Sequence, residues 1–145
     1  MDFTLKEEQK ALQETAKKFA NNELVQDAKD IEKNNIPPSK ILLKKYAELG
    51  FLGINLSTNY GGAGLSHFDA VLVLEEIAKV SIAVAFPIFE ASFGPALAIS
   101  HFAPKELRNR ILPKVCSGDM VIAVSMSEPE AGSALTDLTT KAEVL

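Results

Sequence analysis

Cysteine is almost absent from this sequence, in which Cys116 is the single example among 145 residues. A lone cysteine excludes an internal disulfide, and it makes a reducing cytoplasm the default environment. No histidine lies close to Cys116 along the chain. We therefore interpret Cys116 as a packing residue rather than a catalytic thiol.

Concentrated positive charge is missing as well. The net charge is −4, and Arg and Lys form no run interleaved with aromatic residues, which argues against nucleic acid as a partner. The N-terminal MDFTLKEEQK lacks the apolar core of a secretory signal and the Arg-rich character of a mitochondrial presequence. With 47% hydrophobic and 23% charged residues, the composition is typical of a globular protein, and we expect it in the cytoplasm.

Apolar residues recur at helical spacing in several parts of the chain, which predicts amphipathic helices. The first helix should run from about Leu5 into the twenties and bend near Asn21-Asn22. The second should run from Ser39 to Leu49 and end at Gly50, a residue suited to a left-handed cap. Another should cover Pro104 to Val115.

Ser66 and Asp69 have the spacing of an N-terminal cap for a further helix. We expect this helix to turn a set of mainly apolar side chains toward a core, namely Phe68, Val71, Leu72, Ile77 and Ala78. The stretch before it, Phe51 to Ser66, is rich in Gly, Ser, Thr and Asn and should be a loop. Its glycines lack the spacing of a dinucleotide fingerprint or a P-loop, so a structural role is favoured over a phosphate cradle.

Charge is nearly absent from Ser81 to Phe102, which contains one carboxylate, Glu90, and one histidine, His101. Length and apolarity would allow a membrane span. Pro87 and the Gly94-Pro95 pair argue against a span, and we expect a helix buried on all sides of a soluble bundle. A buried Glu90 needs either a partner or a cavity beside it. His67 and His101 are expected at the surface, and no metal-ligand spacing exists.

The chemistry of the sequence changes sharply within Val121 to Ser133. A short apolar run to Val124, the end of a strand expected from Asp119, gives way to small residues, hydroxyls, one Pro and one Gly. Such a loop exposes backbone N–H groups to a polar, flat or anionic ligand, although an ordinary boundary between a strand and a turn fits the pattern as well. A second strand is expected to open at Thr139.

This loop carries a resemblance to a known family. Residues 127 to 133, Ser-Glu-Pro-Glu-Ala-Gly-Ser, resemble the flavin-binding signature of the acyl-CoA dehydrogenases. Residues 60 to 66, Tyr-Gly-Gly-Ala-Gly-Leu-Ser, resemble the family's Tyr-Gly-Gly-x-Gly-Leu-Ser, with Glu75-Glu76 at the expected distance. Leu112-Pro113 with Ser117-Gly118 is similar to its Leu-Pro-x-x-x-x-Gly segment, and residues 138 to 142 are similar to its Ile-Lys-Thr-x-Ala continuation. The matches are collinear over nearly the whole chain.

The resemblance implies a mainly α fold, with an N-terminal all-α domain over residues 1–118 and the start of a middle β domain over residues 119–145. Family members have a C-terminal four-helix bundle that holds the catalytic glutamate and forms a homotetramer. Neither the bundle nor the catalytic glutamate is matched in this sequence. We therefore expect a fragment that is inactive, has no catalytic residue of its own, and binds FAD weakly or not at all by itself.

The resemblance also implies ligand sites. FAD would contact Val124, Ser125, Met126, Ser127, Gly132 and Ser133. An acyl-CoA substrate would contact Ser133 and Glu90, although a structural hydrogen bond from Glu90 to another helix is the favoured interpretation. Glu128 would brace the loop rather than act as a base. Two departures, Ala134 in place of the family's usual Asp and Val124 in place of a frequent aromatic residue, point to a divergent subfamily.

The reaction implied for the complete protein is α,β-desaturation of an acyl-CoA to a trans-2-enoyl-CoA, with an electron-transfer flavoprotein as acceptor. Acyl-CoA oxidases and flavin monooxygenases remain as rivals within the same class. A non-catalytic helical module, or one chain of a split flavoprotein, is the alternative from another class.

Overall fold

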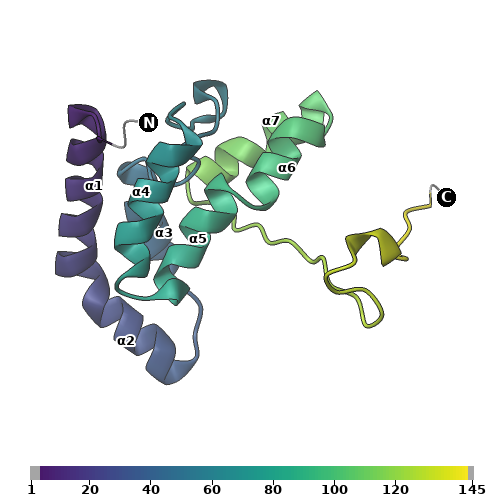
Figure 1. Ribbon diagram of the computed structural model, residues 1–145, viewed down its shortest axis with the longest axis horizontal. Helices are drawn as coiled ribbons and strands as arrows, with labels where there is room; N and C mark the ends of the chain where they lie inside the picture. The colour runs from purple at the N-terminus through teal and green to yellow at the C-terminus, as the bar shows by residue number, and fades with distance from the viewer. Residues whose placement is uncertain (1–3, 144–145) are drawn as a thin grey trace.

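The computed structural model describes residues 4–143, and the part of the chain that it describes is mainly helical. The α-helices are α1 (Glu7–Phe19), α2 (Val25–Asn34), α3 (Lys40–Glu48), α4 (His67–Ala78), α5 (Ile82–Ser92), α6 (Pro95–Phe102) and α7 (Lys105–Cys116). Short 3-10 turns lie at Thr58–Tyr60 and Leu135–Asp137. Figure 1 shows the helices packed together, whereas residues 119–143, here called the arm, run outward from the end of α7.

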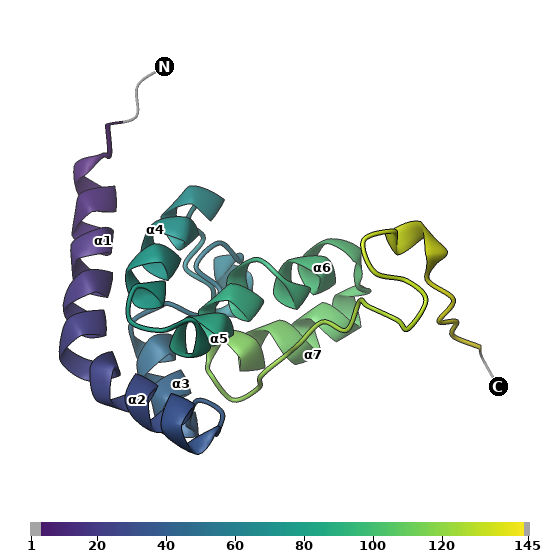
Figure 2. The same cartoon turned by 60° about the horizontal axis from the view of Figure 1, so that its bottom comes forward.

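The bend expected near Asn21-Asn22 is confirmed, and its cause is a π-helical turn at Ala20–Leu24. This turn joins α1 to α2 without a loop, and α2 leaves in a new direction (Figure 2). The helical path continues to Asn34, further than expected, and stops where Asn35 takes a left-handed conformation with φ of 51°.

The helix caps follow the sequence closely. The Ser66 hydroxyl accepts a bond from Asp69 N at 3.1 Å, and the Asp69 carboxylate accepts one from Ser66 N at 2.8 Å. This reciprocal pair is a capping box, which satisfies amides that the first turn of α4 leaves free. Gly50 follows α3 with φ of 70°, the left-handed conformation that glycine adopts at least cost.

One apolar core joins helices α1 to α5 and the end of α7. Within it, Phe19 meets the rings of Tyr46 and Phe51 edge to face, with centroids 5.8 Å and 6.1 Å apart. The buried Tyr46 hydroxyl donates to the Val84 carbonyl at 2.8 Å, and burial raises the pKa of Tyr46. A buried phenol with a partner stabilises one particular packing of α3 against α5.

The face of α4 that meets the core matches the expected one only in part: Leu72 and Ile77 are buried and Ala78 packs against the core, as predicted. Ala70, Val73 and Ile77 are buried, whereas Phe68 and Val71 are about half exposed. Helix α4 packs between α1 and α5, so the buried side is the one that touches both neighbours. The prediction that Phe68 and Val71 point inward is therefore wrong.

Residues 82–102 form two helices rather than one. Gly94 and Pro95 separate α5 from α6, because Pro95 has no N–H to continue α5 and restricts the residue before it. Several apolar side chains are exposed, including Ile82 at 70% and Phe102 at 87%. Length and apolar composition alone would let this segment cross a membrane. In the structure, 39% of its most apolar 18-residue stretch is buried. The expectation of a helix buried on all sides is wrong.

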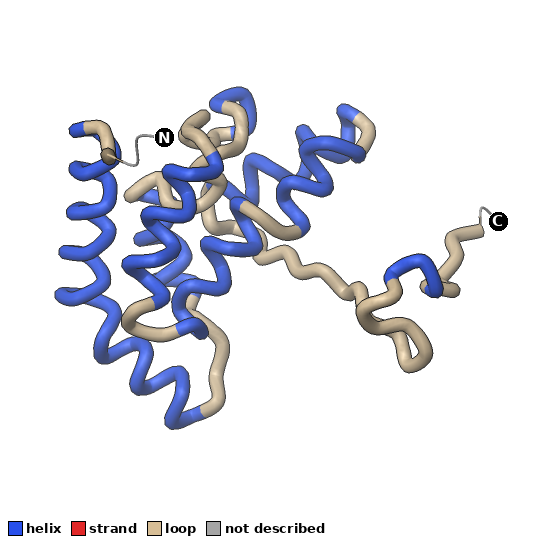
Figure 3. The backbone as a smooth tube through the Cα atoms, viewed as in Figure 1, coloured by secondary structure: helices blue, strands red, loops and turns tan. Residues whose placement is uncertain are grey.

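Residues 4–143 contain no β-strand (Figure 3). The strand expected from Asp119 to Val124 is an extended segment without a partner, and the only bridge described joins Glu128 to Ala131. The second expected strand, from Thr139, is likewise unpaired through residue 143, and its last two residues lie outside the described part. A strand requires a neighbouring strand for its ladder of hydrogen bonds, and the described residues supply none.

Candidate functional site

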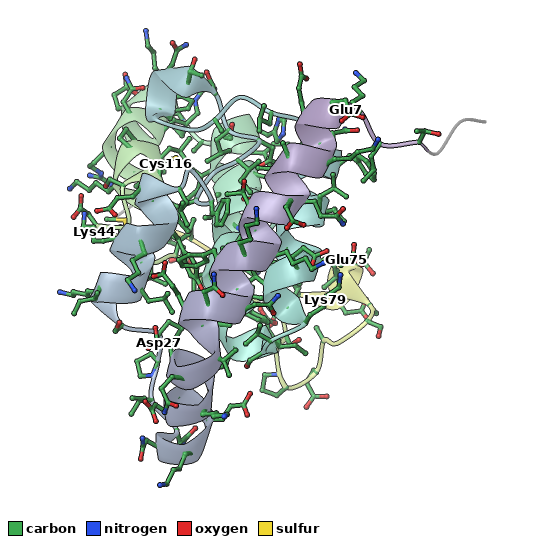
Figure 4. All side chains as sticks on the ribbon, turned by 90° about the vertical axis from the view of Figure 1, so that its left-hand side faces the viewer. Glu7, Asp27, Lys44, Glu75, Lys79 and Cys116 are labelled. Carbon is green, nitrogen blue, oxygen red and sulfur yellow. The ribbon has the colours of Figure 1, made fainter. Side chains whose placement is uncertain are left out.

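The end of α7 fixes the point at which the arm leaves the helices. Gly118 has φ of 70°, and a Cβ added there would lie 2.7 Å from the Leu43 carbonyl oxygen, so only glycine fits. Lys44 (labelled in Figure 4) donates to the Ser117 carbonyl at 2.8 Å and to the Asp119 carboxylate at 2.6 Å. The hydrogen bond from the Lys44 ammonium holds the pKa of Asp119 below its usual value. Helix α3 therefore anchors the start of the arm.

The next part of the arm is extended and open to solvent. Met120 and Ile122 still pack against the helices, but Val124 and Met126 are about half exposed. Among residues 4–143, no hydrogen bond from the backbone amides of residues 121–127 is found. Seven consecutive residues, nearly all of them exposed, thus present donors and acceptors that are free to pair with a strand or a ligand.

Residues 128–140 form a closed loop held by one carboxylate. Glu128 and Ala131 exchange backbone bonds of 2.9 Å and 3.1 Å around a tight turn. The Glu128 carboxylate then accepts the amide and hydroxyl of Thr139 on Oε2, at 2.8 Å and 2.9 Å. Its Oε1 accepts the amide of Thr140 at 2.9 Å and the Thr140 hydroxyl. We call this four-bond contact the clasp.

The clasp decides what Glu128 can do chemically. Its hydrogen bonds, with the Thr140 hydroxyl the largest contributor, lower the pKa of Glu128 from 4.5 to about 2. A carboxylate held this firmly in its charged form is a poor proton acceptor. The structure therefore agrees with a bracing role for Glu128. In the sequence, the only signal of its partners is a pair of threonines after the loop.

The residues predicted to contact FAD lie together on the arm, and all are exposed: Val124, Ser125, Met126, Ser127, Gly132 and Ser133. A Cβ added at Gly132 would meet nothing within 4 Å, so neither crowding nor a left-handed backbone explains this glycine within the described residues. Unused amides, three serine hydroxyls and an open glycine form a donor set that fits a flat, polar group.

Glu90, the other predicted site residue, lies elsewhere. It is buried on α5, and its Oε2 atom has no hydrogen-bond partner among residues 4–143, so the favoured bond to another helix is not found for this atom. Burial raises the pKa of the Glu90 carboxyl. Beside it lies a cavity of about 10 Å³. Its lining extends along the arm as far as Ile122 and includes none of the six residues predicted to contact FAD. That volume holds roughly one water molecule.

Within the glycine loop, the amides of residues 61 to 65 are not free to bind a phosphate. The amides of residues 61 to 65 all donate to backbone carbonyls of residues 53 to 58, at 2.9 to 3.2 Å. A Cβ on Gly62 would lie 2.3 Å from the Leu56 carbonyl oxygen. The structural role expected for this loop agrees with both observations. Cys116 is buried as expected, and desolvation raises its pKa to about 11, which makes it unreactive.

Comparison with known proteins identifies the helical part of the chain. Residues 6–119 match the family model described as acyl-CoA dehydrogenase, N-terminal domain. The chain therefore belongs to the acyl-CoA dehydrogenase family. It is 37% identical over 140 residues to the mitochondrial isovaleryl-CoA dehydrogenase of Bos taurus, covering 96% of this chain and 33% of the relative. The chain thus spans about a third of the length of that relative.

Solved structures agree with this assignment. A glutaryl-coenzyme A dehydrogenase in complex with glutaryl-CoA superposes with a TM-score of 0.87 at 30% identity, covering 96% of this chain and 36% of that one. An acyl-CoA dehydrogenase from Bacillus anthracis complexed with FAD superposes with a TM-score of 0.82 at 27% identity, covering 92% and 23%. Homologous acyl-CoA dehydrogenases bind FAD.

Proposed function

We propose that this chain supplies the N-terminal helical domain and a flavin-facing loop to an FAD-dependent acyl-CoA dehydrogenase, which converts an acyl-CoA thioester to a trans-2-enoyl-CoA. The observation that carries the proposal is the arm: seven residues with unused backbone amides lead into a loop that is already closed by the clasp. This arm begins where the match to the family's N-terminal domain ends.

Four of the six residues predicted to contact FAD have a proposed role. The Ser127 hydroxyl and amide donate hydrogen bonds to the flavin ring and stabilise negative charge there. Met126 offers backbone atoms to the polar edge of the ring, and Gly132 leaves room for close approach. Ser133 lies at the boundary between flavin and the pantetheine of the substrate. When bound, the flavin would supply the acceptor for the hydride that leaves the β-carbon of the acyl group.

Glu90 is proposed to form part of the wall of the acyl site. Its carboxyl is buried and its Oε2 atom is unpartnered among residues 4–143, which favours the neutral, protonated form. The adjoining cavity takes only about one water, so we propose that Glu90 closes the far end of the acyl site and limits the length of the acyl group.

The remaining parts of the reaction are proposed to lie outside these residues. We assign no catalytic base among them, since the low pKa of Glu128, about 2, removes the most tempting candidate. We propose that the base comes from polypeptide equivalent to the other two thirds of the relatives. An electron-transfer flavoprotein as acceptor, a homotetramer and a cytoplasmic location are proposed for the complete protein.

A second candidate is a chain of a split flavoprotein, or a helical module without catalysis. The observation that favours it is the arm, because the amides of residues 121–127 have no acceptor among residues 4–143 and are open to a partner chain. Within the flavoprotein class, an oxidase or monooxygenase reaction would use the same loop. These alternatives differ in what completes the site, which a reassembly experiment measures.

The experiment combines the 145-residue chain with the C-terminal two thirds of the bovine relative. We expect the chain alone to remain colourless and the mixture to retain yellow flavin and to reduce a dye when an acyl-CoA is added. Ser127→Ala should weaken flavin retention, whereas Ser100→Ala, on α6, should not. Flavin retention without dye reduction by isovaleryl-CoA or glutaryl-CoA would contradict the dehydrogenase assignment. Flavin bound stoichiometrically by the chain alone would contradict the need for a partner segment.

A further inference from the structure

We propose that Thr139 and Thr140 are positioning residues, which act through the Glu128 carboxylate to fix the shape of residues 128–140 before flavin arrives. This inference rests on the proposed function, because it assigns the fixed shape to flavin binding. The geometry behind it belongs to the chain itself and is measurable without flavin.

The clasp is a two-point contact. Each carboxylate oxygen of Glu128 accepts one amide and one hydroxyl, so Thr139 occupies Oε2 and Thr140 occupies Oε1. Bonds to a charged acceptor are stronger than bonds between neutral groups. Two oxygens with separate partners also set the direction of the chain at residues 139–140, which a single bond would leave free to rotate.

Within the described residues, the clasp is the only hydrogen-bonded link found across the loop. The other bonds inside it join near neighbours: Glu128 to Ala131, Ala134 to Asp137, and Thr136 to Asp137. The clasp instead joins residues 11 and 12 positions apart. Without it, the two ends of a loop with little burial would be free to separate.

The predicted flavin contacts depend on this link. Gly132 and Ser133 lie inside the closed loop, and Ser127 directly precedes Glu128. Their relative positions therefore follow from where residues 139–140 hold the carboxylate. The family pattern that residues 138–142 resemble has lysine at the position of Thr139, so the bond of 2.9 Å from the Thr139 hydroxyl is a feature of this sequence.

The test uses Thr→Val substitutions, which remove a hydroxyl but keep the amide and nearly the same shape. The double variant Thr139→Val with Thr140→Val is compared with Thr136→Val, a matched control whose hydroxyl reaches only Asp137. Amide NMR signals of the 145-residue chain report the loop. We expect the double variant to shift the Gly132 and Ser133 signals and Thr136→Val to leave them in place. Unchanged signals in the double variant would overturn the proposal.

The second measurement is flavin affinity in the reassembled protein. The double variant removes two bonds to a charged group and should raise the flavin dissociation constant by at least about tenfold, the scale of a single such bond. Thr139→Ser with Thr140→Ser, which restores both hydroxyls, should recover the affinity. A loosened loop with unchanged affinity would refute the positioning role. If even the unsubstituted protein retains no flavin, the proposed function fails, while the NMR comparison still decides whether the two hydroxyls shape the loop.

Discussion

The helical part of the molecule and the arm are held together in different ways. Side chains such as Val73, Ile77 and Ile88 have no exposed surface in the helical part, whereas Ala131 is the one residue classed as buried among residues 119–143. The first region is stabilised by apolar burial, which accumulates over many contacts. The arm depends on its anchor at Lys44 and on the hydrogen bonds of the clasp.

This difference shows which substitutions should matter in each region. Volume and shape decide the outcome in the helical part, because a packed interior has no room to adjust. In the arm, hydroxyls and the charge on Glu128 decide the outcome. Each test substitution is therefore best compared with a control substitution of the same residue type, placed in the other region or at the protein surface.

The largest effect is expected from a cavity in the core. Ile77→Ala removes a side chain that is fully buried on α4 and should lower the free energy of unfolding by about 2–5 kcal/mol. Ile41→Ala, at a position 73% exposed on α3, should change it by less than about 0.5 kcal/mol. Urea unfolding followed by circular dichroism measures both. Equal losses would mean that the core does not dominate stability.

The next largest difference in stability is expected between alanine substitutions at two glycines. Gly62→Ala pushes a Cβ to within 2.3 Å of the Leu56 carbonyl oxygen, and the backbone must shift, at about 1–3 kcal/mol. Gly132→Ala meets nothing within 4 Å and should leave the melting temperature of the chain unchanged. Differential scanning calorimetry makes the comparison. A stable Gly62→Ala variant would show that the glycine loop yields more readily than its hydrogen bonds indicate.

A smaller effect is expected when one buried hydroxyl is removed. Tyr46→Phe deletes the donor to the Val84 carbonyl, which lies 2.8 Å away, and should cost about 1 kcal/mol of unfolding free energy. Tyr60→Phe, in the partly exposed glycine loop, serves as the control. Chemical denaturation at neutral pH measures the two variants. No loss in Tyr46→Phe would indicate that water replaces the missing donor.

Lowering the pH is expected to change global stability least. The change should be confined to the arm. Glu128 has its pKa lowered to about 2 from 4.5. A lowered value stabilises the folded loop fully above pH 4.5, and the contribution is lost as the pH falls toward 2. Carbon NMR of the Glu128 carboxyl should show this low midpoint, with Thr140→Val raising it. A midpoint near 4.5 in the unsubstituted chain would rule out the clasp in solution.

Much of the helical part could be predicted from sequence, for local reasons. The Ser66–Asp69 capping box, Gly50 and the bend at Asn21-Asn22 depend on residues close together in the chain. The inward face of α4 was predicted only in part, because both sides of that helix are apolar and its neighbours leave Phe68 and Val71 exposed. The break at Gly94-Pro95 escaped prediction because the apolar composition of residues 82–102 outweighed the signal of the proline.

Prediction was weaker in the arm. The extended conformation from Asp119 was expected, but a strand depends on partners that the described residues do not provide. The placement of Ser127, Gly132 and Ser133 on one exposed loop follows from contiguity. The link from Glu128 to Thr139 and Thr140 spans 11 to 12 residues of irregular chain, and no periodicity signals such a contact.

The π-helical turn at Ala20–Leu24 has a consequence for charge. Extending the stripe of Leu12, Ala16 and Phe19 through an unbroken α-helix would bring Glu23, Asp27 and Asp30 toward the core. One extra residue in the turn rotates helix α2 by about 100°, and Leu24, Ala28 and Ile31 are buried instead. Glu23 is left outside, where it pairs with Lys45 at 2.7 Å. Deleting a single asparagine there would let an unbroken α-helix keep Leu24, Ala28 and Ile31 on the buried stripe, whereas straightening the turn without a deletion would carry the three acids toward the core.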